Sequence, residues 1–159
     1  MKTYRHLLIL FFATFLITNL NAQEIGIKGG LNITFFIVVE GDFGTNPDTE
    51  TGVYGGIFAD FEFENNFHLQ PEVIYAGVGE LNLINAPIYI KYDATNTFHV
   101  LVGPSLNYFF DLFANNFKVR ADLSFEYDFS SDLNMHMKYT FGLEELSPNI
   151  LFIGLGYRL

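Results

Sequence analysis

The stretch ILFIGLGYRL, Ile150–Leu159, decides the fold. Every second residue, counted back from the end, belongs to an entirely apolar set: Leu159, Tyr157, Leu155, Ile153 and Leu151. The alternate positions hold Arg158, two glycines and two further apolar residues. Because side chains alternate across a β-strand, the stretch predicts a strand with one wholly apolar face and one glycine-rich face. The rest of the chain must show what covers the apolar face.

The first 22 residues have the layout of a secretory signal peptide. Two basic residues precede an apolar run that ends at about Leu20, and the small residue Ala22 offers a cleavage site before Gln23. The run is short for a membrane-spanning helix, and an N-terminal anchor helix is the alternative. We therefore expect a signal peptide over 1–22 and one domain over 23–159.

The expected mature chain is acidic and contains no cysteine. It has 137 residues with 6 basic and 18 acidic side chains, a net charge of −12, which argues against nucleic acid as a partner. Without Cys there is neither a disulfide framework nor a lipidated cysteine at the cleavage site. Half of the full chain is hydrophobic, with 19 Phe and 9 Tyr, so the chain is too apolar to be disordered.

Eight runs of alternating polarity follow, separated by turn residues, and no amphipathic helix is apparent. In each run one face carries no charged residue, Asn or Gln, while the other face holds the charges. In the sixth run, for example, Asp122 lies on the polar face and Leu123 on the apolar face. The eight runs cover 24–35, 51–64, 67–79, 82–93, 97–110, 117–129, 132–144 and 149–159.

Two architectures give this pattern. A soluble sandwich or lipocalin-like barrel turns its apolar face inward, whereas a membrane barrel turns it outward to lipid. Glycines on the polar faces suit a narrow interior, and large aromatic residues toward the ends of the apolar faces suit interfacial girdles. The pattern therefore favours an all-β fold, an eight-stranded antiparallel up-and-down transmembrane β-barrel, over the soluble alternative.

Three prolines lie inside consecutive runs of this expected barrel, at Pro71, Pro87 and Pro104. Each proline removes a hydrogen-bond donor from the sheet, and a closed barrel has no edge strand on which to place it. The sequence therefore predicts β-bulges or locally widened pairing at these three positions.

Four segments of the chain resemble the PorT-like outer-membrane β-barrel family, a porin family found in Gram-negative Bacteroidota. They are FHLQPEVIYAGVG (Phe67–Gly79), LNLINAPIYIKYD (Leu81–Asp93), VLVGPSLNYFF (Val100–Phe110) and the closing IGLGYRL. The resemblance extends over essentially all of the expected mature chain and implies a porin-like outer-membrane barrel. Leu159 stands where this family usually ends in Phe, and the last strand is the expected contact with the barrel-assembly machinery.

The histidines of the mature chain are the metal-site candidates. His68, His99 and His136 fall on polar faces near the starts of odd-numbered runs, so all three should point inward near the periplasmic mouth. Three imidazoles can bind zinc, and the alternative is that each pairs with an inward carboxylate. We expect no metal and no cofactor. We also expect no enzyme, because Ser105 and His99 lie too far apart for a nucleophile and its base.

The longest expected connection, Phe36 to Glu50, is acidic. It contains Glu40, Asp42 and Asp48 as well as Glu50, without the regular ligand spacing of a calcium loop. A solvated acidic loop is the simple interpretation, and a receptor or adhesion surface that binds a cation is the alternative.

The polar faces should fill the lumen with a nearly balanced set of charges. Eight strands enclose a space just wide enough for side chains to fill, and confined charges are costly unless they are paired. We therefore expect a plugged lumen with nine charged residues: Lys28, Asp60, Glu62, Glu72, Lys91, Arg120, Asp122, Glu126 and Lys138.

These features together predict a small outer-membrane barrel with a structural or surface-exposed role and both termini in the periplasm. Outer-membrane lipid and the assembly machinery are its expected partners, with no nucleic acid. The alternative is an interaction component of a secretion or surface-assembly complex, which would contact an unidentified protein through its loops or periplasmic turns.

Overall fold

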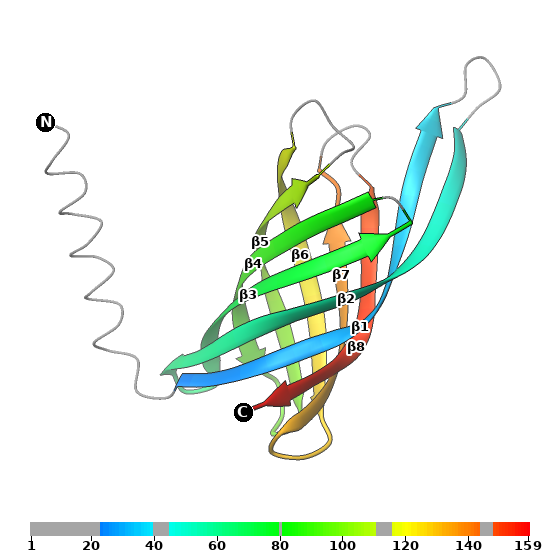
Figure 1. The fold of residues 1–159 in the computed structure, drawn as a ribbon. Coiled ribbons are helices and arrows are strands. Elements are labelled where there is room, and N and C mark those ends of the chain that lie inside the picture. The colour runs from blue at the N-terminus through cyan, green and yellow to red at the C-terminus, as the bar shows by residue number, and fades with distance from the viewer. Residues whose placement is uncertain (1–22, 40–44, 80, 111–115, 144–147) are drawn as a thin grey trace, which may run out of the picture.

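Eight antiparallel strands form a closed barrel in the computed structural model, as the alternation predicts (Figure 1). The model describes residues 23–39, 45–79, 81–110, 116–143 and 148–159, so the expected signal peptide lies outside the described residues. The strands are β1 (Gln23–Val39), β2 (Thr45–Glu64), β3 (Phe67–Val78), β4 (Leu81–Asp93), β5 (Phe98–Phe109), β6 (Phe117–Asp128), β7 (Leu133–Phe141) and β8 (Asn149–Arg158). The described part of the chain contains no helix long and apolar enough to cross a membrane.

The barrel closes where β8 pairs with β1, from Gly26↔Arg158 to Phe35↔Asn149. Gln23 and Leu159 therefore lie at the same end, called here the near end, and the opposite end is the far end (Figure 1). Paired residues can be followed around the barrel from Lys28. Through β2, β3, β4 and β5 they lead to Lys118 on β6, and through β8 and β7 they lead to Asp128 on β6. The two end points on β6 differ by ten residues, which is the stagger of the barrel. This stagger tilts the strands strongly and brings side chains from distant strands together inside the barrel.

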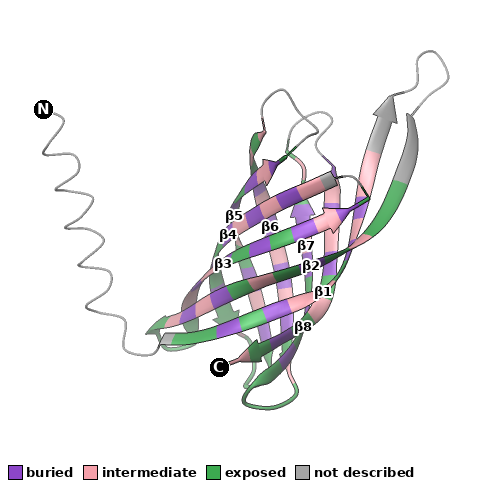
Figure 2. Cartoon of the chain, viewed as in Figure 1, coloured by how far each residue is buried: buried purple, intermediate pink, exposed green. Residues whose placement is uncertain are grey.

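The apolar faces point outward and the polar faces point inward. Leu31 is 56% exposed while its neighbour Asn32 is fully buried, and Val119 is 59% exposed while Arg120 is 1% exposed. The same alternation runs along every strand in Figure 2. A lipocalin-like barrel would have the opposite arrangement, so the soluble alternative is wrong and the expected transmembrane barrel is confirmed.

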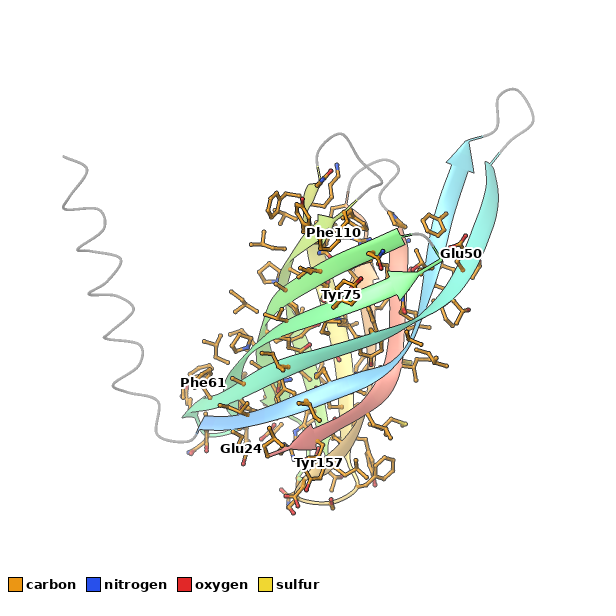
Figure 3. The ribbon with its side chains drawn as sticks, in the orientation of Figure 1. Glu24, Glu50, Phe61, Tyr75, Phe110 and Tyr157 are labelled. Carbon is orange, nitrogen blue, oxygen red and sulfur yellow. The ribbon has the colours of Figure 1, made fainter. Side chains whose placement is uncertain are left out.

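Aromatic side chains gather at both ends of the outward surface. Tyr75 and Phe110 lie toward the far end, and Tyr157 lies at the near end (Figure 3). Ring contacts extend each group around the barrel: Phe63–Phe67–Tyr92 at the near end, and Tyr75–Phe110–Tyr108–Phe117 at the far end. Two aromatic bands that flank an apolar zone are the arrangement expected of a membrane-spanning barrel.

The prolines interrupt the hydrogen-bonded ladder without shifting its register. The pairs on either side of each gap fit one register: Phe58↔Glu72 and Phe61↔Leu69 in β2–β3, Pro71↔Ile88 and Ile74↔Asn85 in β3–β4, and Pro87↔Ser105 and Ile90↔Val102 in β4–β5. Of the two predicted outcomes, bulges do not occur at these prolines: the pairing is interrupted there with its register unchanged. The register shift that is present in β2–β3 lies beside the turn, between Glu62 and Glu64.

The β1–β2 hairpin extends past the other strands at the far end (Figure 1). The predicted loop from Phe36 to Glu50 is therefore too long, because β1 continues to Val39 and β2 begins at Thr45. Asp48 and Glu50 are strand positions, while Glu40 and Asp42 lie outside the described residues. By contrast, the connections after β2, β4 and β6 at the near end are short, as predicted.

The glycine-rich face of β8 makes room for side chains inside the barrel. A Cβ added at Gly154 would collide with the Gly29 carbonyl oxygen and the Tyr54 hydroxyl. A Cβ at Gly156 would lie 2.5 Å from Asn134 Oδ1. The glycines therefore allow β8 to lie close to β1 and leave room for the Tyr54 side chain beside Gly154.

We expect Gly154→Ala to destabilise the barrel by about 1–3 kcal/mol, because the added methyl group overpacks a filled interior. Urea unfolding of the refolded barrel would measure this change in the free energy of unfolding. Gly55→Ala is the matched control, since a Cβ at Gly55 meets no atom within 4 Å. Equal stability of the two variants would contradict the packing role assigned to Gly154.

Candidate functional site in the barrel lumen

The middle of the lumen is built around Lys28, which lies between two carboxylates. Its Nζ donates to Glu72 Oε1 at 2.5 Å and to Glu126 Oε1 at 3.0 Å. Gln70 Nε2 donates to the same two oxygens, at 2.9 and 3.2 Å. The four side chains come from β1, β3 and β6 and are all buried. One cation and one amide thus hydrogen-bond two carboxylates away from solvent, and the cation balances one of the two negative charges.

A second cluster forms around Asp122 on β6. Its carboxylate accepts hydrogen bonds from Ser105 Oγ at 2.7 Å, Asn85 Nδ2 at 3.2 Å and the Tyr89 hydroxyl at 3.3 Å. Lys138 Nζ lies 3.9 Å from Asp122 and donates to Asn85 Oδ1 at 2.5 Å. Every one of these side chains is buried. Ser105 therefore serves as a hydrogen-bond donor to a lumen carboxylate, and it does not contact His99.

The near-end mouth contains a chain of alternating basic and acidic side chains. In order, its members are Lys91, Asp60, His68, Asp93, His99, Asp128 and Arg158. Successive contacts span 2.5–3.2 Å, and Arg158 Nη2 contacts both oxygens of Asp128 at 3.0 Å. These residues line a polar cavity of about 240 Å³ together with Glu24, Glu62 and Asn96. Strands from most of the barrel circumference thus meet through side chains at this mouth.

The three candidate zinc ligands do not converge. His68 and His99 share Asp93 at the mouth, whereas His136 lies elsewhere, with Nε2 2.5 Å from the Tyr54 hydroxyl. The expected pairing with carboxylates therefore describes His68 and His99 but not His136. The described residues contain no group of three or more His, Cys, Asp or Glu side chains placed to hold a metal ion.

Two of the nine predicted lumen charges depart from the expected network. Glu62 is exposed at the near-end mouth and is not part of the buried interior, because it lies next to the β2–β3 turn. Arg120 is 1% exposed, and its guanidinium has no hydrogen-bond partner among the described residues. The Arg120 guanidinium carbon lies 5.8 Å from the centre of the Phe109 ring. The other seven residues lie buried, as predicted.

An apolar cluster that the sequence patterns did not predict packs inside the far half of the barrel. Its buried members are Tyr54, Ile74, Ala76, Leu83, Phe109, Ile150 and Phe152, with Phe36 packed against them. Most of these residues share the parity of the charged positions on their strands. Parity therefore could have placed them inside, but the predicted lumen was built from the charged residues alone.

We expect Lys28→Met to lower the free energy of unfolding by about 3–5 kcal/mol, because it leaves two buried carboxylates without their cation. Urea unfolding of the refolded barrel would measure the loss. The double variant Lys28→Met with Glu72→Gln should recover part of it, since one of the two charges is then removed as well. A loss below about 1 kcal/mol would show that the ion pairs do not support the interior.

The comparisons with known proteins support the fold. No protein-family model and no curated protein matches the chain. A de novo designed transmembrane β-barrel is 17% identical with a TM-score of 0.58, over 86% of this chain and 95% of the design. Ail, the attachment invasion locus protein of Yersinia pestis, solved with the heparin analogue sucrose octasulfate, is 10% identical with a TM-score of 0.57, over 87% of this chain and 100% of Ail. Neisserial surface protein A is 12% identical with a TM-score of 0.50, over 87% and 99%. The chain therefore has the fold of eight-stranded transmembrane barrels.

Proposed function

We propose that the chain is a small outer-membrane barrel protein that loses residues 1–22 as a signal peptide. Its apolar outward surface, the aromatic bands and the likeness to Ail and Neisserial surface protein A support this location. The resemblance of its segments to the PorT-like family supports it too. The near end, which carries the short turns and Leu159, then faces the periplasm, because the periplasmic turns of such barrels are short.

We further propose that the lumen is plugged and that the protein has a structural or surface-exposed role. The observation that carries this proposal is the interleaving of buried charges of both signs around Lys28 and Asp122. A conducting pore selects ions with charged side chains of one sign that line a water-filled path. Here the carboxylates around Lys28 and Asp122 instead accept hydrogen bonds from side chains of other strands. The apolar cluster adds a second obstruction in the far half. This role includes no catalysis.

A second candidate function is an interaction component of a secretion or surface-assembly complex. The β1–β2 hairpin favours it, because this hairpin extends beyond the barrel into the space where a partner could contact it (Figure 1). Phe36, at the base of the hairpin, packs against the apolar cluster of the lumen, and the two functions are compatible in one molecule.

We expect planar-bilayer recordings of the wild-type barrel to show no steady ion current, because buried charged side chains and an apolar cluster pack inside a narrow eight-stranded barrel. A stable, reproducible open state would refute the plug. The detergent used for refolding should be added alone as the control, since detergent itself disturbs bilayers.

We expect Leu123→Arg to assemble poorly into lipid. The change places a cation on the outward face of β6, where it costs about 2–4 kcal/mol if the position lies at the bilayer midplane. Heat-modifiable mobility on gels would measure the folded fraction after refolding into vesicles. Leu123→Met keeps the size and polarity of the side chain and should assemble normally. Normal assembly of Leu123→Arg would mean that this face does not contact lipid.

A further inference from the structure

A groove lies on the outward surface where the β2–β3 ladder is interrupted. Pairing stops at Phe58↔Glu72 and resumes at Phe61↔Leu69, so Ala59 and Pro71 stand opposite each other without forming a pair. The groove has a volume of about 260 Å³, and its outward lining residues come from β1, β2 and β3: Ile25, Ile57, Ala59, Pro71 and Val73. The groove therefore lies over the gap that Pro71 makes in the wall of the barrel.

The shape of the groove follows from the sizes of these side chains. Ala59 and Pro71 are short, so the outer surface is low over the gap. Ile57 and Val73, which pair with each other, stand beside the gap toward the far end, and Ile25, which pairs with Ala59, stands on the β1 side. These three larger side chains are exposed on the outer face. The result is a hollow with apolar walls that opens outward.

The two remaining lining residues, Phe58 and Glu72, are chain neighbours of the outward residues, and both are buried. The Glu72 carboxylate accepts hydrogen bonds from Lys28 and Gln70 inside the barrel. The groove therefore offers no free polar side chain that would hold water in place, because an ordered water needs several polar partners. Left empty, the groove would deprive its walls of dispersion contacts.

The position of the groove identifies its occupant. The groove is continuous with the apolar outward surface, and Phe63 of the near-end aromatic band lies four residues beyond Ala59 on β2, about 13 Å along the strand. Aromatic bands lie at the level of the lipid headgroups, so the groove lies at the depth of the acyl chains. A single hydrocarbon chain suits a hollow of this volume, whereas an α-helix with its side chains is about 10–12 Å wide.

We propose that this groove binds one acyl chain of a phospholipid from the periplasmic leaflet. The inference rests on the proposed outer-membrane location with the near end in the periplasm, and it is independent of the plug and of the interaction role. The acyl chain fills the hollow over Ala59 and Pro71, so one phospholipid stays with the barrel while the lipids around it exchange.

Native mass spectrometry of the refolded barrel tests the binding. The barrel is refolded in a maltoside detergent with palmitoyl-oleoyl-phosphatidylethanolamine, and the detergent is removed in the gas phase. The wild type should retain one phospholipid, which its mass distinguishes from a detergent molecule. Ala59→Phe fills the groove from within and should lower the lipid-bound fraction by about fivefold or more, because the acyl chain loses the apolar surface that it covers.

Ala121→Phe is the matched control. Ala121 is also an outward alanine opposite a proline, but its pair with Pro104 is intact, and it is not part of the groove. Its lipid-bound fraction should stay within about twofold of the wild type. Ala59→Leu, which fills the groove less, provides the second test if Ala59→Phe fails to fold.

Photo-crosslinking in vesicles locates the acyl chain. A phosphatidylethanolamine with a diazirine in one acyl chain should label Ile57 and Val73 about fivefold more than Val102, because a bound chain stays beside the groove. Val102 is 56% exposed and Ile57 is 58% exposed. Val102 lies four residues from the near end of its strand, as Pro71 does, so simple contact with surrounding lipid would label these sites equally.

The outcomes separate the groove from the membrane location. No retained phospholipid, a detergent adduct only, a dimer without lipid, equal retention by Ala59→Phe and Ala121→Phe, or equal labelling of Ile57 and Val102 would each overturn the inference. All of these outcomes leave the membrane location intact if the wild type assembles in vesicles and Leu123→Arg does not. Normal assembly of Leu123→Arg would instead count against the location itself.

Discussion

The structure depends on the hydrogen-bonded closure of one sheet inside an apolar environment. A strand edge in lipid would leave N–H and C=O groups without partners, at a cost of several kcal/mol each. Pairing of β1 with β8 over ten residue pairs removes that edge. Closure sends every second side chain into a narrow interior. The interior therefore has glycines at Gly154 and Gly156 where strands crowd, and hydrogen-bond partners for most of its buried charges. Pairing of β1 with β8 ends at Phe35↔Asn149, whereas pairing of β1 with β2 continues to Val39↔Thr45.

Alternation along each strand predicted most of the fold. The opposite faces of Asp122 and Leu123 followed from parity alone, because a strand offers only two directions to its side chains. The ends of β1 and β2 did not follow, since Gly41, Gly44 and Pro47 look like loop residues in the sequence. The sequence also did not reveal that the ladder is interrupted at the prolines without a shift of register. The backbone of Pro71 faces β2, so its missing N–H interrupts the β2–β3 ladder. The pairs on both sides of this gap keep one register, so no bulge forms.

The contacts of the lumen could be predicted only in part. Parity placed Lys28 and Glu126 inside, but their contact across the barrel depends on the ten-residue stagger, which no single strand reveals. The same stagger separates His136 from the two histidines at the mouth. Arg120 shows the limit most clearly. Its inward direction was predictable, but its lack of a hydrogen-bond partner among the described residues was not.

The chain of charges at the near-end mouth also specifies the alignment of the strands. A one-residue slip between neighbouring strands would expose polar side chains to lipid, so hydrophobicity rejects it. A two-residue slip keeps the polar side chains inside and the apolar side chains outside, so hydrophobicity does not exclude it. It moves one strand by about 7 Å relative to its neighbour, far beyond the reach of a hydrogen bond. Asp93 would then lose His99, and Asp128 would lose Arg158. The contacts at the mouth thus favour the native stagger over a register shifted by two residues.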